Sequence, residues 1–208
     1  KIKVIHNPAI EKDIERTEIR KNVTYIGQFS KQRGLHVLLS IWNDILREVP
    51  DAKLHLIGSG NLYGNNHNTF GKIGITEKKY ERQISKFLLD SDGNIKESIK
   101  IMGIMGIEKY DLYKNTSVGI FNPYGYETLG ISGIEMASSG VPVVTIDKFG
   151  QSETVSHQKS GFLFRKKKHF KNYIIKLLND EELNYQMGNY AKKWVLEKFQ
   201  IDNILLQW

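Results

Sequence analysis

Short runs of β-branched and aromatic residues alternate with longer stretches of helical periodicity along most of this chain, and this alternation restricts the folds that the chain can adopt. A typical run is Val23 to Ile26, which is β-branched or aromatic throughout and stops at Gly27. Such runs are typical of parallel strands buried on both faces. We therefore predict an α/β fold with a parallel sheet and helices on both of its faces.

The predicted elements follow one another in regular alternation. The strands cover residues 23–26, 53–57, 99–102, 118–121, 141–146 and 161–164. One helix starts at Leu35 and ends before Pro50, and the others cover residues 77–89, 108–114, 129–138, 151–155, 170–178 and 183–199. Residues 61–74 are rich in Asn and Gly and are predicted to form a surface loop.

The length and composition favour one globular domain. With 208 residues the chain can bury a substantial core. It has no apolar run of about 18 residues, and its first residues lack the pattern of a signal peptide. The absence of cysteine excludes disulfides and fits a cytoplasmic protein. Because the chain starts at Lys1 rather than at a methionine, we expect a fragment of a longer protein.

The charge of the chain favours anionic partners. The formal net charge is +7, from 30 Lys and Arg against 23 Asp and Glu. No zinc finger, basic zipper or RNA-binding aromatic signature occurs, so we expect a small phosphate-bearing ligand rather than a nucleic acid. The charged residues 11–21 are expected at the surface. The basic run 165–168 is interpreted as a solvated turn, with peripheral contact to anionic lipid at the inner face of the membrane as the other possibility.

Two carboxylates stand out in residues 122–144. Between Thr128 and Ile146, Glu135 is the one charged side chain, and a charge on an otherwise neutral helix needs a partner if it is buried. Glu127 lies at the predicted start of the same helix, where unpaired backbone N–H groups can bind an anion. In one interpretation Glu127 caps the helix and Glu135 pairs with an internal Arg or Lys. In the other, both carboxylates contact a ligand.

The spacing of the two carboxylates favours an elongated ligand. They are eight positions apart, which on a continuous helix separates their backbones by about 12 Å. The two carboxyl groups of a glycosidase lie closer, roughly 5 to 9.5 Å apart across one bond. The amides of Leu129 and Gly130 lie between the two carboxylates. This order suits a ligand with a phosphate between two hydroxyl-rich groups, such as a nucleotide sugar.

Ligands of parallel α/β sheets bind beyond the carboxyl ends of the strands. The segments after the predicted strands are therefore expected to form one rim: residues 27–34, 58–60, 103–106, 122–130 and 149–153. Lys31 and Arg33 lie just before a helix, which is an unfavourable place for cations unless an anion joins them. They can also be interpreted as solvated cations of a surface loop. Gly58 permits close approach of a ligand but is also common in turns.

The order of these motifs resembles the C-terminal, donor-binding half of the retaining GT-B glycosyltransferases of family 4. Glu127 to Glu135 reads Glu-x7-Glu and is followed by Gly-Val-Pro-Val-Val and then by Gly-x-x-Glu-x-Val at 150–155. Residues 4–8 are similar to the interdomain linker of that family, and residues 25–34 to its first strand and phosphate loop. The resemblance covers nearly the whole chain apart from the loop at 61–74.

The resemblance implies a Rossmann-like domain that binds a nucleotide sugar. Residues 1–21 would form the interdomain linker and the start of the domain, and residues 22–208 the nucleotide-sugar-binding domain. The N-terminal acceptor domain would be absent from this chain.

The resemblance also implies roles for individual residues. Glu135 would bind the ribose hydroxyls, Glu127 would contact the donor sugar, and Arg33 would hold the diphosphate. Further donor-binding positions would be Gly27, Lys31, Gly58, Ile104, Met105, Thr128, Leu129 and Gly130. Gln28 replaces an arginine of the family's phosphate loop, and Lys31 is a candidate substitute for that arginine. Thr128 and Leu129 stand where the family usually has Gly-Phe.

Membership of this family would imply transfer of a hexose-type sugar, with a UDP-sugar as the leading donor, to a glycan, polysaccharide or lipid-linked acceptor. Glu127 and Arg33 would be the catalytic residues, and helix amides would help to stabilise the departing diphosphate, so neither a cofactor nor a metal is expected. The isolated fragment would be inactive. The alternatives are another GT-B enzyme, such as a nucleotide-sugar epimerase, or a non-catalytic sugar-nucleotide or glycan-binding module.

Overall fold

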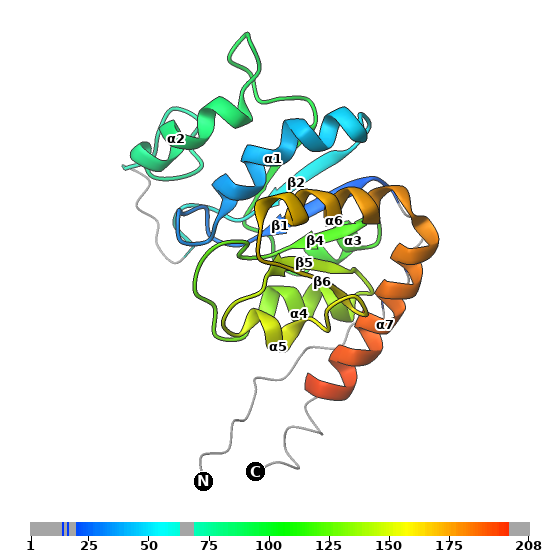
Figure 1. The fold of residues 1–208 in the computed structure, drawn as a ribbon. Helices are drawn as coiled ribbons and strands as arrows, with labels where there is room; N and C mark the ends of the chain where they lie inside the picture. Colours follow the sequence, from blue (N-terminus) through cyan, green and yellow to red (C-terminus); the bar gives the residue numbers. More distant parts are fainter. Residues whose placement is uncertain (1–13, 15, 17–19, 63–68, 200–208) are drawn as a thin grey trace.

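A six-stranded parallel sheet forms the centre of the protein. The computed structural model describes Ile14, Arg16 and residues 20–62 and 69–199. The strands lie in the order β3-β2-β1-β4-β5-β6, and every neighbouring pair is parallel (Figure 1). Their bounds are Asn22–Ile26 (β1), Lys53–Ile57 (β2), Ile99–Gly103 (β3), Val118–Ile120 (β4), Val143–Ile146 (β5) and Gly161–Phe164 (β6). This confirms the predicted α/β fold.

Helices cover both faces of the sheet. Apolar side chains of α1, α2 and α6 pack on one face and those of α3 and α4 on the other, and α7 contributes to both clusters. Figure 1 shows α1 and α2 above the sheet and α4 and α5 below it. The helices are Leu35–Glu48 (α1), Lys78–Leu88 (α2), Lys109–Tyr113 (α3), Ile131–Ser138 (α4), Gln151–Thr154 (α5), Lys167–Asn179 (α6) and Glu181–Phe199 (α7). None of these described helices is long and apolar enough to cross a membrane.

Local chemistry sets the element boundaries that differ from the predictions. The helix predicted from Leu129 begins at Ile131, because Gly130 has φ 79 and ψ 57, a left-handed conformation that cannot continue a right-handed helix. The strand predicted from Val141 begins at Val143, because the N–H of Val141 instead donates to the carbonyl of Met136 at the end of α4 (3.0 Å). Helix α6 starts three residues before its predicted start, and the remaining boundaries agree with the predictions to within two residues.

The strand order reverses between β1 and β4. From β1 the chain proceeds outward to β2 and β3, and it then returns to β4 beside β1 and continues to β5 and β6 on the other side. The loops after β1 and β4 therefore lead in opposite directions and leave a crevice at the carboxyl edge of the sheet. Ligands of open α/β sheets bind at such a reversal.

Arg16 attaches the segment before β1 to the amino edge of the sheet. Its Nη1 donates to the carbonyl of Gly140 (3.0 Å) and to Oδ1 of Asn184 (2.9 Å), and its Nη2 donates to the carbonyl of Thr116 (2.8 Å). Burial lowers the pKa of this guanidinium to about 10. The expectation that residues 11–21 lie at the surface is thus wrong for Arg16 and for the buried Ile14. The predicted linker at 4–8 and residues 63–68 of the predicted loop lie outside the described residues.

Candidate functional site

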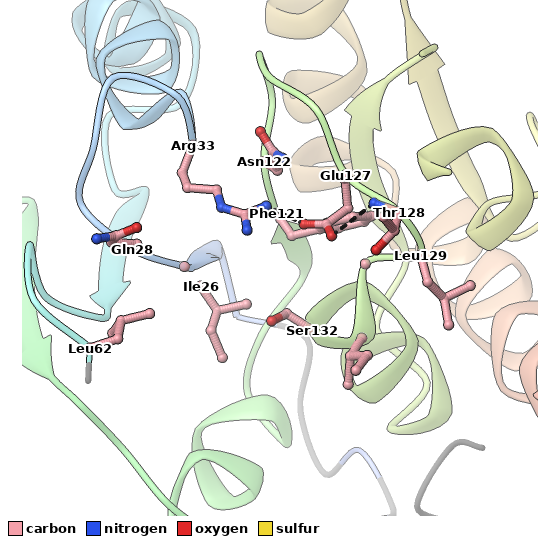
Figure 2. A pocket seen from close by; sticks show the side chains of 13 residues that line it. Ile26, Gln28, Arg33, Leu62, Phe121, Asn122, Glu127, Thr128, Leu129 and Ser132 are labelled. Atoms are coloured by element: carbon pink, nitrogen blue, oxygen red, sulfur yellow. Dashed lines mark hydrogen bonds and ion pairs between the residues drawn. The ribbon is translucent and has the colours of Figure 1, made fainter. Parts of the chain in front are cut away.

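A cleft of about 270 Å³ lies between the loop after β1 and the loop after β4, where the strand order reverses. Figure 2 shows side chains of the two loops facing each other across it. The residues that line the cleft are Ile26, Gly27, Gln28, Arg33, Leu62, Phe121, Asn122, Glu127, Thr128, Leu129, Gly130, Ile131 and Ser132. The predicted positions Gly27, Arg33 and 127–130 are therefore brought together here.

Arg33 and Glu127 form an ion pair across the cleft. Nη1 of Arg33 lies 2.5 Å from Oε2 of Glu127, and Figure 2 shows the guanidinium directed at the carboxylate. The other carboxylate oxygen accepts the N–H of Thr128 (3.1 Å). The side chain of Arg33 is 38% exposed and that of Glu127 is 19% exposed. Exposed pairs of this kind contribute about 1 kcal/mol or less, so a ligand can replace either partner at small cost. Arg33 lies just before a helix, where a cation is unfavourable unless an anion joins it. Within the described residues, Glu127 supplies that anion.

The residues at and just before the start of α4 line the cleft and carry backbone donors. The structure gives the N–H groups of Leu129, Gly130 and Ser132 no backbone acceptor within the described residues, as expected where a helix begins. Gly130 is required here, because a Cβ in its place would overlap the ring of Phe121 and because its φ is positive. N–H groups at a helix start bind anions, phosphate included.

Asn122 holds the loop that carries Glu127. It is 3% exposed, and its Nδ2 donates to the carbonyl of Tyr126 (2.9 Å) while its Oδ1 accepts the N–H of Gly125 (2.9 Å). Its own φ of 32 is in the left-handed region, which asparagine tolerates better than most residues. Asn122 belongs to the predicted rim segment 122–130, but no role was predicted for its side chain. The available signal was an Asn-Pro step followed by a glycine, which is typical of a turn.

Helix α5 supports the same loop from behind. Gln151 donates to the carbonyl of Gly125 (3.0 Å), and Thr154 donates to the carbonyl of Leu129. The side chains of Gln151 and Thr154 are both buried. Residues 149–153, which were predicted to belong to the rim, therefore position the cleft without lining it.

The loop after β1 is fixed by Tyr25 and Gln28. The buried hydroxyl of Tyr25 donates to the carbonyls of Arg33 (3.0 Å) and Gln28 (3.3 Å). Burial raises the pKa of Tyr25 above its ordinary value, so the hydroxyl remains a donor at physiological pH. Nε2 of Gln28 donates to the carbonyl of Gly60 (2.9 Å). The residue that replaces an arginine of the family pattern thus joins the loops after β1 and β2.

Glu135 lies outside the lining of the cleft. Its carboxylate pairs with Lys109 of α3, whose Nζ lies 2.9 Å from Oε1 and 2.8 Å from Oε2. This is the internal pairing that one of the two interpretations predicted. Because α4 starts at Ile131, no continuous helix joins Glu127 to Glu135. The estimated axial separation of about 12 Å therefore does not apply to them.

The remaining predicted positions also lie outside the lining of the cleft. Lys31 lines a neighbouring pocket of about 360 Å³. Gly58 has φ 139 and packs against the carbonyl of Gly27, which leaves no room for a side chain. Ile104 is 61% exposed, and Met105 packs at the edge of the α3 and α4 cluster. Over the described ranges, no group of three or more metal-ligating side chains is placed to hold a metal ion.

Comparison with curated proteins gives relatives over most of the chain. The chain is 29% identical over 179 residues to the capsular polysaccharide biosynthesis glycosyltransferase CapM of Staphylococcus aureus, and 26% identical over 181 residues to spore coat protein SA of Bacillus subtilis (strain 168). The alignments cover 85% and 84% of this chain but 42% and 44% of those two proteins. The chain thus spans less than half the length of these relatives.

A solved structure shares the fold. TarM of Staphylococcus aureus, crystallised in complex with UDP and α-GlcNAc-glycerol among other ligands, matches with a TM-score of 0.73 and 22% identity over 99% of this chain and 37% of that chain. The family described as glycosyl transferases group 1 matches residues 7–194. A match of this extent includes every strand of the sheet and both walls of the cleft. The chain therefore belongs to the glycosyl transferases group 1 family.

Proposed function

We propose that this chain is the donor-binding domain of a retaining glycosyltransferase, which transfers a hexose-type sugar from a nucleotide sugar to a glycan, polysaccharide or lipid-linked acceptor. One observation carries the proposal. At the reversal of the strand order, Arg33, the free N–H groups at the start of α4 and the carboxylate of Glu127 converge on one cleft. Positive and donor groups beside a carboxylate suit a diphosphate that is joined to a sugar.

The comparisons support the same class of donor. TarM is described in complex with UDP, and CapM is named as a glycosyltransferase of capsular polysaccharide biosynthesis. UDP-sugars are accordingly our first choice of donor. Since the chain covers 42% of CapM, the acceptor is proposed to bind mainly to the remainder of the protein.

The proposed mechanism uses the cleft to stabilise the leaving group. The bond between the anomeric carbon of the sugar and the diphosphate oxygen breaks, and a bond from that carbon to the oxygen of an acceptor hydroxyl forms on the same face. The proton of that hydroxyl passes to an oxygen of the departing diphosphate. Arg33 and the amides of Leu129 and Gly130 would stabilise the charge that develops on the departing diphosphate. Glu127 would contact the sugar. The positive charge of Arg33 takes the part that a metal ion plays in other transferases, so we propose that no metal is needed.

Glu127→Ala in the full-length protein tests this assignment. Loss of a group that contacts the sugar in the transition state is expected to lower turnover by about a hundredfold or more. The affinity for UDP should not fall, because the variant frees Arg33 from its ion pair. The measurement is sugar transfer and UDP calorimetry, after the wild type has been screened with UDP-, GDP- and ADP-sugars. Transfer is expected to persist in excess EDTA, and its loss would reverse the metal-free proposal.

Glu48→Ala is the matched control for Glu127→Ala, because Glu48 is at the end of α1, where it pairs with Lys171 (2.8 Å) outside the lining of the cleft. Glu48→Ala should leave turnover and UDP affinity unchanged. Normal turnover of Glu127→Ala would remove the sugar contact. Donor epimerisation without any acceptor would favour an epimerase, and binding without turnover would favour a binding module.

A cytoplasmic position with contact to the inner face of a membrane is also proposed. It is supported by the basic run 165–168, in which every side chain is exposed. Lys167 and Lys168 stand in the first turn of α6, where a helix favours anions rather than cations. An anionic lipid surface would relieve this conflict.

A further inference from the structure

Glu135 and Lys109 form a shielded ion pair between two helices. Each side chain is 15% exposed. Nζ of Lys109 contacts both carboxylate oxygens, at 2.9 and 2.8 Å, so the orientation of the carboxylate is fixed from one side. Other ion pairs of the described residues are more exposed, for example Lys114 with Asp111 at 41% and 77%.

The pair lies next to the cleft. Glu135 is three residues after Ser132 and four after Ile131, which both line the cleft, and residues at these spacings share one face of a helix. Lys109 is the first residue of α3, three positions after the end of the rim segment 103–106 that follows β3. The carboxylate of Glu135 therefore continues the α4 wall of the cleft toward the loop after β3.

The neighbouring hydroxyl groups do not balance the charge of Glu135. Burial, and secondarily the charge of Glu135, raises the pKa of both Tyr110 and Tyr113 above the ordinary value, so both stay neutral at physiological pH. Lys109 is the cation that the structure pairs with Glu135. A carboxylate this shielded would be left with an uncompensated charge if that lysine were removed.

A carboxylate paired in this way can still accept hydrogen bonds from a ligand. It has about four acceptor positions, two on each oxygen, and Lys109 uses one on each. One position on each oxygen remains, which suits the two adjacent hydroxyls of a ribose. The lysine and a diol can therefore be bound at the same time, and the lysine determines the direction in which the free positions point.

We propose that Lys109 is a positioning residue for ribose recognition, which orients the carboxylate of Glu135 toward the 2′- and 3′-hydroxyls of the donor nucleotide. The proposal rests on the proposed function and assigns a role to a residue that no motif of the sequence indicated. Lys109 itself touches neither the sugar nor the phosphate.

The test compares UDP with 2′-deoxy-UDP in the full-length protein. The wild type is expected to bind UDP about tenfold or more tightly than the deoxy form, since one hydrogen bond to a charged group is lost. Lys109→Met should reduce this ratio to below about threefold, chiefly by weakening UDP. Lys109→Arg, which keeps a cationic donor, should restore most of the ratio. Affinities are measured by calorimetry, and folding is checked by circular dichroism.

Three further variants make the result decisive. Lys114→Met removes a lysine of the same segment that pairs with the exposed Asp111, and it should keep the wild-type ratio. Lys109→Gln is shorter and uncharged, so it should not hold both carboxylate oxygens as the ammonium does, and it serves if the methionine variant does not fold. An unchanged ratio in folded Lys109→Met or Lys109→Gln, or tighter binding of UDP, overturns the proposal. If Glu135→Gln also keeps the ratio, the ribose contact of Glu135 itself fails. Failure of the proposed function would instead show as absence of UDP binding and of sugar transfer in the wild type, so the failures are distinguishable.

Discussion

Arg33 is the positively charged side chain among the residues that line the cleft. Replacing it with methionine should weaken UDP by about ten- to a hundredfold, the value of a hydrogen bond between charged groups. The affinity for uridine should stay within about twofold, because uridine has no phosphate. Calorimetry of the full-length protein with both ligands measures the difference.

Arg47→Met is the matched control for this prediction. Arg47 is also an arginine of the segment after β1, but its side chain is 78% exposed and pairs with Asp44 on the surface of α1 (2.7 Å). The Arg47→Met variant should bind UDP and uridine with the affinities of the wild type. An equal loss of UDP and uridine in Arg33→Met would instead indicate that Arg33 supports the loop.

Single residues also show how far the sequence could predict the site. Arg33 and Glu127 were both identified, each from its position beside a helix start. Their ion pair could not be predicted, since they are separated by 93 intervening positions and meet only because β4 lies beside β1. One of the two interpretations gave Glu135 an Arg or Lys as its partner, but nothing in the sequence distinguished Lys109 from the other cations.

Between elements, the close approach of the loops after β1 and β4 depends on Gly125. A Cβ at this position would overlap the carbonyl of Gln32, so Gly125→Ala should force the two walls of the cleft apart. We expect a loss of about 1 to 3 kcal/mol in the free energy of unfolding and at least a fivefold loss of UDP affinity. Urea unfolding and calorimetry measure the two effects.

Gly93→Ala is the control for a glycine substitution without a clash. Gly93 has φ 83 and has nothing within 4 Å of the position of a Cβ, so it should cost about 1 kcal/mol from backbone strain and leave UDP affinity unchanged. If Gly125→Ala destabilises the protein equally and spares UDP, the spacing of the loops does not control the cleft.

The elements themselves were predictable because buried strands and amphipathic helices leave strong local patterns. The supports of the cleft were not. Asn122, Gln151 and Thr154 act through hydrogen bonds to backbone carbonyls of another loop, and isolated polar residues carry no pattern that reveals such partners. The start of α4 was predicted two residues too early for a similar reason, because no local pattern shows that Gly130 adopts a left-handed conformation.

For the molecule as a whole, the sheet and its two helical layers were predicted, whereas the strand order was not. The order decides which two of the five rim segments form the cleft. Alternation of strands and helices is compatible with several orders, and the hydrophobic pattern of a strand buried on both faces does not reveal its neighbours. Function at this scale was predicted by the resemblance in motif order, which spans nearly the whole chain.

The surface charge of the whole molecule gives a separate prediction. Lys166, Lys167 and Lys168 changed together to glutamine should reduce binding to vesicles that contain phosphatidylserine by about a hundredfold, at roughly 1 kcal/mol for each lysine. Co-sedimentation of the full-length protein at low salt measures this. Changing the exposed Lys78, Lys79 and Lys86 of α2 removes the same charge elsewhere and should have a smaller effect. Equal effects of the two triple variants would mean that net charge alone governs binding.

The ion pair between Arg33 and Glu127 has a consequence for what the cleft rejects. A ligand that pairs with Arg33 must displace the carboxylate of Glu127. Its net gain in binding free energy is therefore the difference between two ion pairs rather than the full value of one. A simple carboxylate offers the same single charge as Glu127 and gains little from the exchange. A diphosphate brings more charge and more acceptor oxygens, which the N–H groups of Leu129 and Gly130 can also bind. The cleft therefore discriminates by charge, because Glu127 already occupies Arg33 and favours a multiply charged ligand over a simple carboxylate.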